Sequence, residues 1–239
     1  MYFLLSGEGA TDLGVGTRHT VICEGRDYTP GPMAIMVEQI VERRQHYSIR
    51  DSGCCGYVSE QHLSSCAGVF KAATKSLGLP GKKRPKETRY FFNNARALSQ
   101  IAKRKAAERR DEVVAILFRD ADGTASAGRG LWEEKCQSML DGFDQEGFSK
   151  GVPMIPKPKS EAWFICALQR NSYQRCETLE KRSGNDKSPN SLKGELQTLL
   201  GRPVSVELLC EKLLEKAVDI RKIKMPSFNS FRDRLESVI

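Results

Sequence analysis

The stretch Val113-Val-Ala-Ile-Leu-Phe-Arg-Asp-Ala-Asp-Gly-Thr124 decides the fold. Six apolar residues, half of them β-branched, run into two carboxylates, Asp120 and Asp122, and then Gly123. Such a run indicates a strand buried on both faces, as in a parallel sheet that helices cover. An Asp-Gly pair is also common in turns, so this stretch alone leaves a turn and a functional site equally open.

The segments around this strand alternate between strand and helix patterns. Strands are expected at residues 1–6, 46–50 and 152–155, and helices at 32–45, 87–109 and 161–168. From about residue 171 the pattern is helical and charged. We therefore predict an α/β fold, with a parallel sheet flanked by helices over residues 1–170 and a helical C-terminal extension over residues 171–239.

Composition narrows the class of protein. The chain has 239 residues, enough for one large domain, and no run approaches the roughly 18 apolar residues of a membrane span. Residues 1–6 read as a first strand and not as a secretory signal. The eight cysteines are scattered, with no Cys-x-x-Cys pair that would favour zinc. We therefore expect a cytoplasmic protein, outside the membrane, whose cysteines are reduced.

Positive charge is concentrated between Lys82 and Arg110. This segment holds eleven Lys or Arg against two Glu, so it accounts for the chain's whole net charge of +8. A concentrated basic segment is typical of proteins that bind a nucleic-acid backbone, although a solvated helix is the simpler alternative. The candidate phosphate-binding residues are Lys82, Lys83, Arg84, Lys103, Arg104 and Arg109.

Acidic residues follow three of the predicted strands. Glu8 and Asp12 come after the first, Asp120 and Asp122 after the central one, and Glu161 after the last. Because the carboxyl ends of parallel strands meet at one edge, these side chains are expected to converge. Clustered carboxylates favour a hard cation, Mg²⁺ or Mn²⁺. Lys157 and Lys159, beside Glu161, are placed to stabilise charge on a phosphoryl group.

Two of these motifs resemble a known family. Gly7-Glu8-Gly9 after a first strand, with Asp120-Ala-Asp122 after a later one, resembles the Toprim domain of topoisomerases, bacterial primases and OLD-family nucleases. The resemblance covers roughly residues 1–168 and implies a Toprim-like parallel sheet. It also implies that Glu8 acts as an acid, a base or a metal ligand, and that Asp120 and Asp122 bind Mg²⁺.

The spacing Glu8-x-x-x-Asp12 resembles the OLD-type nuclease branch, which implies two metals. Asp12, Ser160 and Glu161 would then join the site, although Ser160 and Glu161 are adjacent here where the family separates them. Lys159 is the candidate catalytic lysine. The branch also implies an ABC-type ATPase partner and a role in defence against phage. The chain has no Gly-x-x-x-x-Gly-Lys-Ser/Thr phosphate loop, so such an ATPase would be a separate subunit.

Two other functions remain open. A buried strand followed by Asp-x-Asp-Gly-Thr also begins haloacid-dehalogenase-like phosphatases, in which Asp120 would be a nucleophile and Asp122 a general acid or base. That interpretation leaves Glu8 and Asp12 unused and finds no later strand ending in metal-binding Asp. A non-catalytic nucleic-acid-binding or assembly subunit is the second alternative. The sequence favours a metal-dependent nuclease acting on DNA or RNA.

Overall fold

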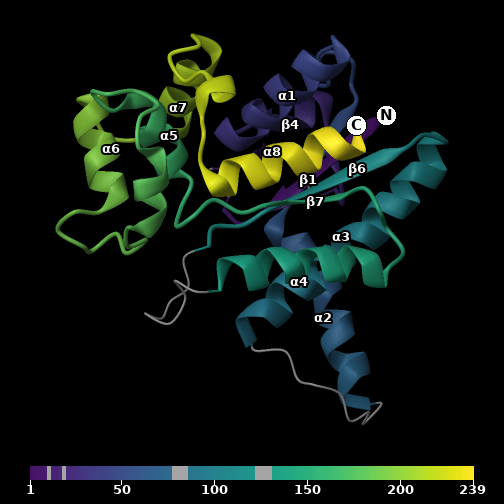
Figure 1. Cartoon of the computed structure of the whole chain (residues 1–239). Coiled ribbons are helices and arrows are strands. Elements are labelled where there is room, and N and C mark those ends of the chain that lie inside the picture. The colour runs from purple at the N-terminus through teal and green to yellow at the C-terminus, as the bar shows by residue number, and fades with distance from the viewer. Residues whose placement is uncertain (10–11, 18–19, 77–85, 122–130) are drawn as a thin grey trace.

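The structure is a computed structural model that describes residues 1–9, 12–17, 20–76, 86–121 and 131–239. Its centre is a five-stranded sheet in the order β3-β5-β1-β6-β7 (Figure 1). The strands are β1 (Tyr2–Gly7), β3 (Cys23–Glu24), β5 (Cys55–Val58), β6 (Val113–Phe118) and β7 (Gly151–Met154). All neighbours pair in parallel except β3, which is antiparallel to β5. A small separate sheet joins β2 (Gly14–Gly16) to β4 (Tyr28–Pro30).

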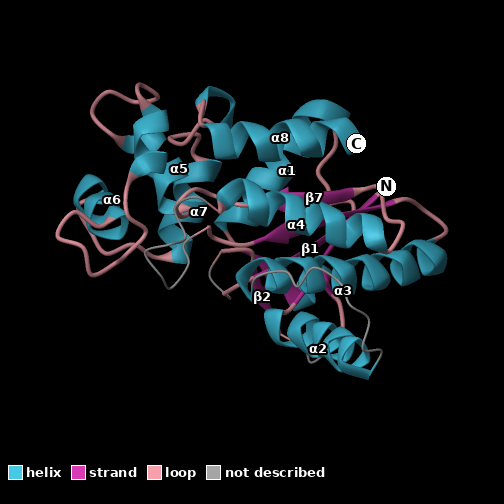
Figure 2. Ribbon diagram, turned by 60° about the horizontal axis from the view of Figure 1, so that its bottom comes forward, coloured by secondary structure: helices cyan, strands magenta, loops and turns pink. Residues whose placement is uncertain are grey.

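Helices cover both faces of the large sheet (Figures 1 and 2). One face carries α1 (Pro32–Gln45), α5 (Glu161–Leu168), α7 (Val206–Leu214) and α8 (Pro226–Val238), with α6 (Leu192–Leu200) beside α5. The other carries α2 (Glu60–Ser76), α3 (Lys86–Arg109) and α4 (Trp132–Gln145). Short 3₁₀ turns lie at Gly25–Asp27, Cys176–Lys181 and Ile220–Lys222. The predicted α/β fold with a helical C-terminal region is confirmed.

The central strands are buried on both sides, as the apolar run at 113–118 predicts. Every residue of β1 and β6 is buried. Phe3 and Leu5 belong to the apolar cluster under α1, α5 and α8, whereas Tyr2 and Leu4 belong to the cluster under α2, α3 and α4. This alternation is the ordinary period of two along a strand, and it sets the direction of side chains just beyond the strand ends.

The C-terminal helices share the first of these clusters. Leu196 of α6, Leu213 of α7 and Phe228 and Phe231 of α8 are all buried with residues of β1, β6 and α1. The rings of Phe228 and Phe231 lie 5.0 and 6.1 Å from the ring of Trp163 in α5. The extension over residues 171–239 therefore packs directly on the sheet domain.

Two expectations were wrong. Residues 46–50 form bends and a turn and not a strand, because α1 ends at Gln45 and the next residue, His46, takes the left-handed conformation, with φ of 62°. The strand that follows α1 is instead β5, a four-residue segment that contains Gly56 and is too short to give a clear apolar pattern.

The second wrong expectation concerns the cysteines. They are not all reduced, because Cys166 and Cys176 form a disulfide between α5 and the 3₁₀ turn that follows it. In the described residues, no helix is long and apolar enough to cross a membrane.

Candidate functional site

The carboxyl ends of β1 and β6 meet closely at one edge of the sheet. Gly7 is paired with Phe118, so Glu8 follows one strand where Arg119 and Asp120 follow the other. A Cβ atom added at Gly7 would lie 2.8 Å from the Cβ and the carbonyl oxygen of Phe118, and 2.9 Å from Leu13. Only glycine allows the two strand ends to come this close.

This close approach gives a prediction for Gly7→Ala. The added methyl group would push against backbone atoms, so we expect the free energy of unfolding to fall by about 1–3 kcal/mol in urea denaturation. Gly68→Ala is the matched control, since a Cβ there meets nothing within 4 Å and Gly68 lies inside α2. That variant should be unchanged or slightly more stable. Equal effects of the two changes would contradict the close contact.

The first group of polar side chains at this edge surrounds Arg119. Its Nη1 atom donates to Glu8 Oε2 at 3.2 Å and to Glu60 Oε1 at 2.9 Å. Glu8 Oε1 accepts the backbone N–H of Asp120 at 2.8 Å. Glu60 also accepts from the Gly9 amide and from the hydroxyl of Tyr90, at 3.2 Å each. Glu8 is therefore held in one orientation by a guanidinium and an amide.

Arg119 is an unusual residue because its charge is almost completely buried. Its relative exposure is 1 %, and Nε and Nη2 have no hydrogen-bond partner among the described residues. The ring of Tyr90 lies 4.5 Å from the guanidinium carbon, a cation–π contact that partly offsets the loss of water. Burial tends to raise the pKa of Glu60, but hydrogen bonds and the charge of Arg119 outweigh it, so this pKa is lowered and Glu60 stays ionised at neutral pH.

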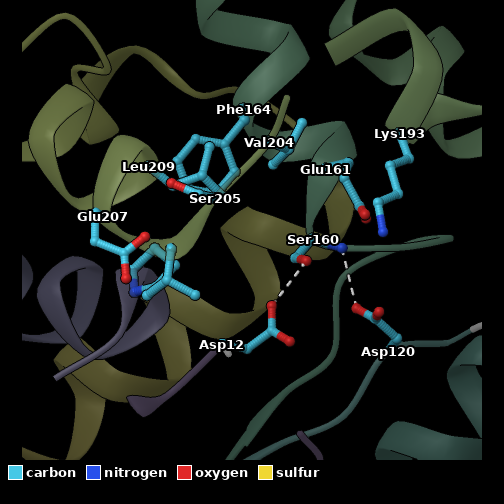
Figure 3. Close-up of a pocket in the computed structure, with 12 residues that line it drawn as sticks. Asp12, Asp120, Ser160, Glu161, Phe164, Lys193, Val204, Ser205, Glu207 and Leu209 are labelled. Atoms are coloured by element: carbon cyan, nitrogen blue, oxygen red, sulfur yellow. Dashed lines mark hydrogen bonds between the residues drawn. The ribbon is translucent and has the colours of Figure 1, made fainter. Parts of the chain in front are cut away.

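The second group is centred on Ser160, just before α5 (Figure 3). The Ser160 backbone N–H donates to Asp120 Oδ1 at 3.0 Å, and its hydroxyl donates to Asp12 Oδ1 at 3.1 Å. Asp12 and Asp120, far apart in sequence, thus share one anchoring residue. The resemblance had suggested Ser160 for this site, and the structure places it between the two aspartates.

Asp12, Asp120, Ser160 and Glu161 line a pocket of about 400 Å³. Glu8 is not among its lining residues, because strand alternation directs Glu8 and Arg119 toward α2 and α3 and directs Asp120 toward α5. The predicted acids therefore lie at the same sheet edge, but they do not converge into the single cluster that was expected among the described residues. Glu8 is directed to the opposite side from Asp120, and the two groups are connected through the backbone of Asp120.

Glu161 lies apart from the two aspartates in this pocket. Figure 3 shows its carboxylate directed toward Lys193 of α6. Its Oε2 atom is buried and has no hydrogen-bond partner among the described residues. Burial raises the pKa of Glu161, and the charges of Lys159 and Lys193 only partly oppose this. The site therefore favours a bound proton or cation at this carboxylate.

This raised pKa gives a second prediction. A carboxyl group with a higher pKa in the folded state holds its proton more tightly there than in the unfolded chain. At pH values below the unfolded pKa both states are protonated, so the group does not change the free energy of unfolding. As pH rises above that value the fold loses stability, until the folded carboxyl has also ionised. Glu161→Gln should remove this loss and raise the melting temperature at pH 7 relative to the wild type. The exposed Glu177→Gln is the control, and a lower melting temperature for Glu161→Gln would contradict the assignment.

The other predicted site residues either do not line the pocket or lie outside the described residues. Lys159 pairs with Asp186 at 3.1 Å and does not line the pocket. Lys157 lies over the ring of Trp132, at 5.7 Å. Asp122, Lys82, Lys83 and Arg84 lie outside the described residues.

The candidate phosphate-binding residues of α3, Lys103, Arg104 and Arg109, are distant from this edge. Tyr90, near the start of α3, contacts Glu60, whereas Arg104 lies about 20 Å further along the helix at ~1.5 Å per residue. Arg109 lies over the ring of Tyr2, at the opposite end of β1, and is 3.8 Å from Glu24. Lys103 donates to the backbone of Glu146. These residues would contact a nucleic-acid backbone only well away from the carboxylates.

Several polar residues of the site were not predicted. Arg119 is part of the quoted strand stretch, but nothing in its local pattern separates it from a surface arginine. Glu60 follows β5, the strand whose pattern was missed. Lys135 of α4 is buried and donates to the carbonyl oxygen of Ala121 at 2.7 Å. A buried lysine has no sequence signal unless the helix face is already known.

The oxygen atoms of this site are of the kind that binds a divalent cation, but few of them lie together. Within the described residues, no group of three or more His, Cys, Asp or Glu side chains is arranged to hold a metal. The residues present are nevertheless suited to Mg²⁺ in type, because Asp12 and Asp120 supply hard oxygen donors and each accepts a hydrogen bond from Ser160. The unpartnered Oε2 of Glu161 lines the same pocket.

Comparisons with known proteins add no family assignment. No protein-family model matches this chain, and no curated protein or solved structure matches it at a significant level.

Proposed function

We propose that this protein is a nuclease that uses Mg²⁺ or Mn²⁺ to cleave phosphodiester bonds of DNA or RNA. The observation that carries the proposal is the joint anchoring of Asp12 and Asp120 on Ser160, beside the pocket and next to Glu8. Four residues from separate parts of the chain are fixed at the edge where parallel sheets place their chemistry. Their order agrees with the Toprim resemblance of the sequence motifs.

A bound Mg²⁺ would supply a water of lowered pKa and positive charge that offsets the charge of the phosphate. Asp12 and Asp120 would hold the cation, with Asp122 as the additional ligand that the motif implies. Glu8 would accept the proton of the attacking water or donate one to the leaving oxygen. Arg119 keeps Glu8 in position and Glu60 keeps Arg119 in position, so both act through Glu8 and do not contact the substrate.

The two alternatives receive less support. A phosphatase with Asp120 as nucleophile gives no role to Glu8, yet Glu8 is bonded to the Asp120 amide and held by a buried arginine. A binding module without catalysis would not need two aspartates fixed on one serine. Burying Arg119 costs free energy, and such a cost is more often found at functional sites.

The proposed partners follow from the resemblance and from charge. Nucleic acid is the proposed substrate, with the basic segment 82–110 as a backbone contact. A separate ABC-type ATPase subunit would regulate cleavage as part of a cytoplasmic system of phage defence. The C-terminal helices are the candidate docking surface, although they also complete the apolar core.

The test is incubation of the purified protein with labelled plasmid and with total tRNA, in Mg²⁺, Mn²⁺ or EDTA. Cleavage in either metal and none in EDTA is the expected result. The Glu8→Gln variant in parallel distinguishes this activity from a contaminating nuclease. Absence of cleavage under all conditions, also with the candidate ATPase added, would favour the binding module.

A further inference from the structure

The C-terminal extension supplies half of the pocket beside Asp12 and Asp120. Its contribution comes from α6, from the start of α7 and from the segment between them, namely Lys193, Val204, Ser205, Val206, Glu207 and Leu209. In Figure 3 the side chains of Val204, Ser205 and Leu209 lie across the pocket from Asp12. The extension therefore shapes whatever binds at the carboxylate edge.

The pocket has an apolar wall and a charged edge. Val204, Val206 and Leu209 are half-buried and form the wall together with Phe164 of α5. Asp12, Asp120 and Ser160 form the edge. A ligand that fills this space must present an apolar, flat or compact part to the valines and leucine and a cation-binding part to the aspartates.

Charge restricts the ligand further. The lining contains the carboxylates of Asp12, Asp120, Glu161 and Glu207 against the single ammonium group of Lys193. A free anion is repelled by this surplus of negative charge, so a phosphate enters only with a divalent cation. Lys193 is exposed and lies beside Glu161, where it can reach a phosphate one position away from the cation.

We infer that this pocket binds one unpaired nucleotide of the substrate, and this inference rests on the proposed nuclease function. The base packs against Val204, Val206 and Leu209, and its phosphate lies at Asp12 and Asp120 with the cation. A volume of about 400 Å³ is large enough for a single nucleotide and too small to enclose a base pair. The preferred substrates are therefore single strands, loops or frayed ends, since extracting a base from a duplex costs a few kcal/mol.

The first test measures binding without cleavage. Thymidine 3′,5′-bisphosphate and uridine 3′,5′-bisphosphate are titrated into the full-length protein by calorimetry, with Mg²⁺ and with EDTA. Binding is expected with Mg²⁺ and should be lost in EDTA. Val204→Trp fills the pocket from a loop and should weaken binding by roughly tenfold or more. Leu199→Trp is the matched control, because Leu199 is 37 % exposed on α6 and does not line the pocket.

A second variant tests the pocket independently, in case Val204→Trp does not fold. Lys193→Ala removes only an exposed side chain and should weaken bisphosphate binding about three- to tenfold, whereas Lys187→Ala, in the preceding loop, should not. Unchanged binding by both Val204→Trp and Lys193→Ala would overturn the inference. Failure of the wild-type protein to bind either bisphosphate in Mg²⁺ would overturn it as well.

The second test compares cleavage of an end-labelled single strand with cleavage of a blunt duplex of the same sequence. The single strand should be cut at least about tenfold faster, and Val204→Trp should lose this activity. Equal cleavage inside the duplex would overturn the inference while supporting the nuclease. Bisphosphate binding by a protein that cleaves nothing would instead support the nucleotide pocket and reject the nuclease.

Discussion

Asp120→Asn is expected to lower the rate of Mg²⁺-dependent cleavage by about 10³-fold or more. The amide has the same shape and still accepts the Ser160 N–H, so the anchoring at 3.0 Å can persist. What is lost is the negative charge that would hold the cation beside Asp12. The measurement is kcat/KM on a labelled single-stranded oligonucleotide, together with Mg²⁺ affinity by calorimetry, and both should fall.

The control for this change is Asp144→Asn, an exposed aspartate in α4. It alters the net charge equally and should leave both measurements unchanged. A phosphatase with Asp120 as nucleophile would also lose activity in Asp120→Asn, so Glu8→Gln is needed beside it. Hydrolysis of a phosphate monoester that depends on Asp120 and not on Glu8 would contradict the nuclease mechanism.

The sequence predicted the centre of the fold because burial leaves a strong pattern there. The run at 113–118 is typical of a strand covered on both faces, and the long amphipathic stretch ending at Arg109 is a helix as expected. Once these strands are parallel, the positions of Glu8 and Asp120 at one edge follow from geometry. Asp12 was expected at this edge because it follows the first strand, whereas Ser160 followed only from the family resemblance, and a hydrogen bond joins the two side chains.

The remaining site residues depend on long-range packing. Glu60 reaches the site only because β5 pairs with β1, and a four-residue strand containing glycine has little pattern to detect. Lys193 and Leu209 reach it because the C-terminal helices fold back over α1 and α5, which no local signal specifies. The net charge of a segment also does not show where its side chains lie. Arg109 belongs to the basic segment, but it contacts Glu24 and Tyr2.

The contacts of Arg119 indicate that it positions Glu8 and contributes little to stability. A buried guanidinium with two donors unpaired among the described residues is costly, and its carboxylate partners are more than a third exposed and can be solvated without it. Stability alone therefore gives little reason for Arg119 to be there. Its effect is to fix Glu8, through a bond of 3.2 Å, next to the backbone of Asp120.

Arg119→Met should therefore affect activity far more than stability. The methionine fills most of the same space under Tyr90, so we expect the free energy of unfolding to change by less than about 2 kcal/mol. Loss of the Glu8 orientation should lower kcat/KM by about 10²-fold, mainly in kcat and with little change in KM. Arg119→Lys should restore part of the rate. A fall in stability that matches the fall in activity, with no recovery of the rate in Arg119→Lys, would mean that Arg119 is only structural.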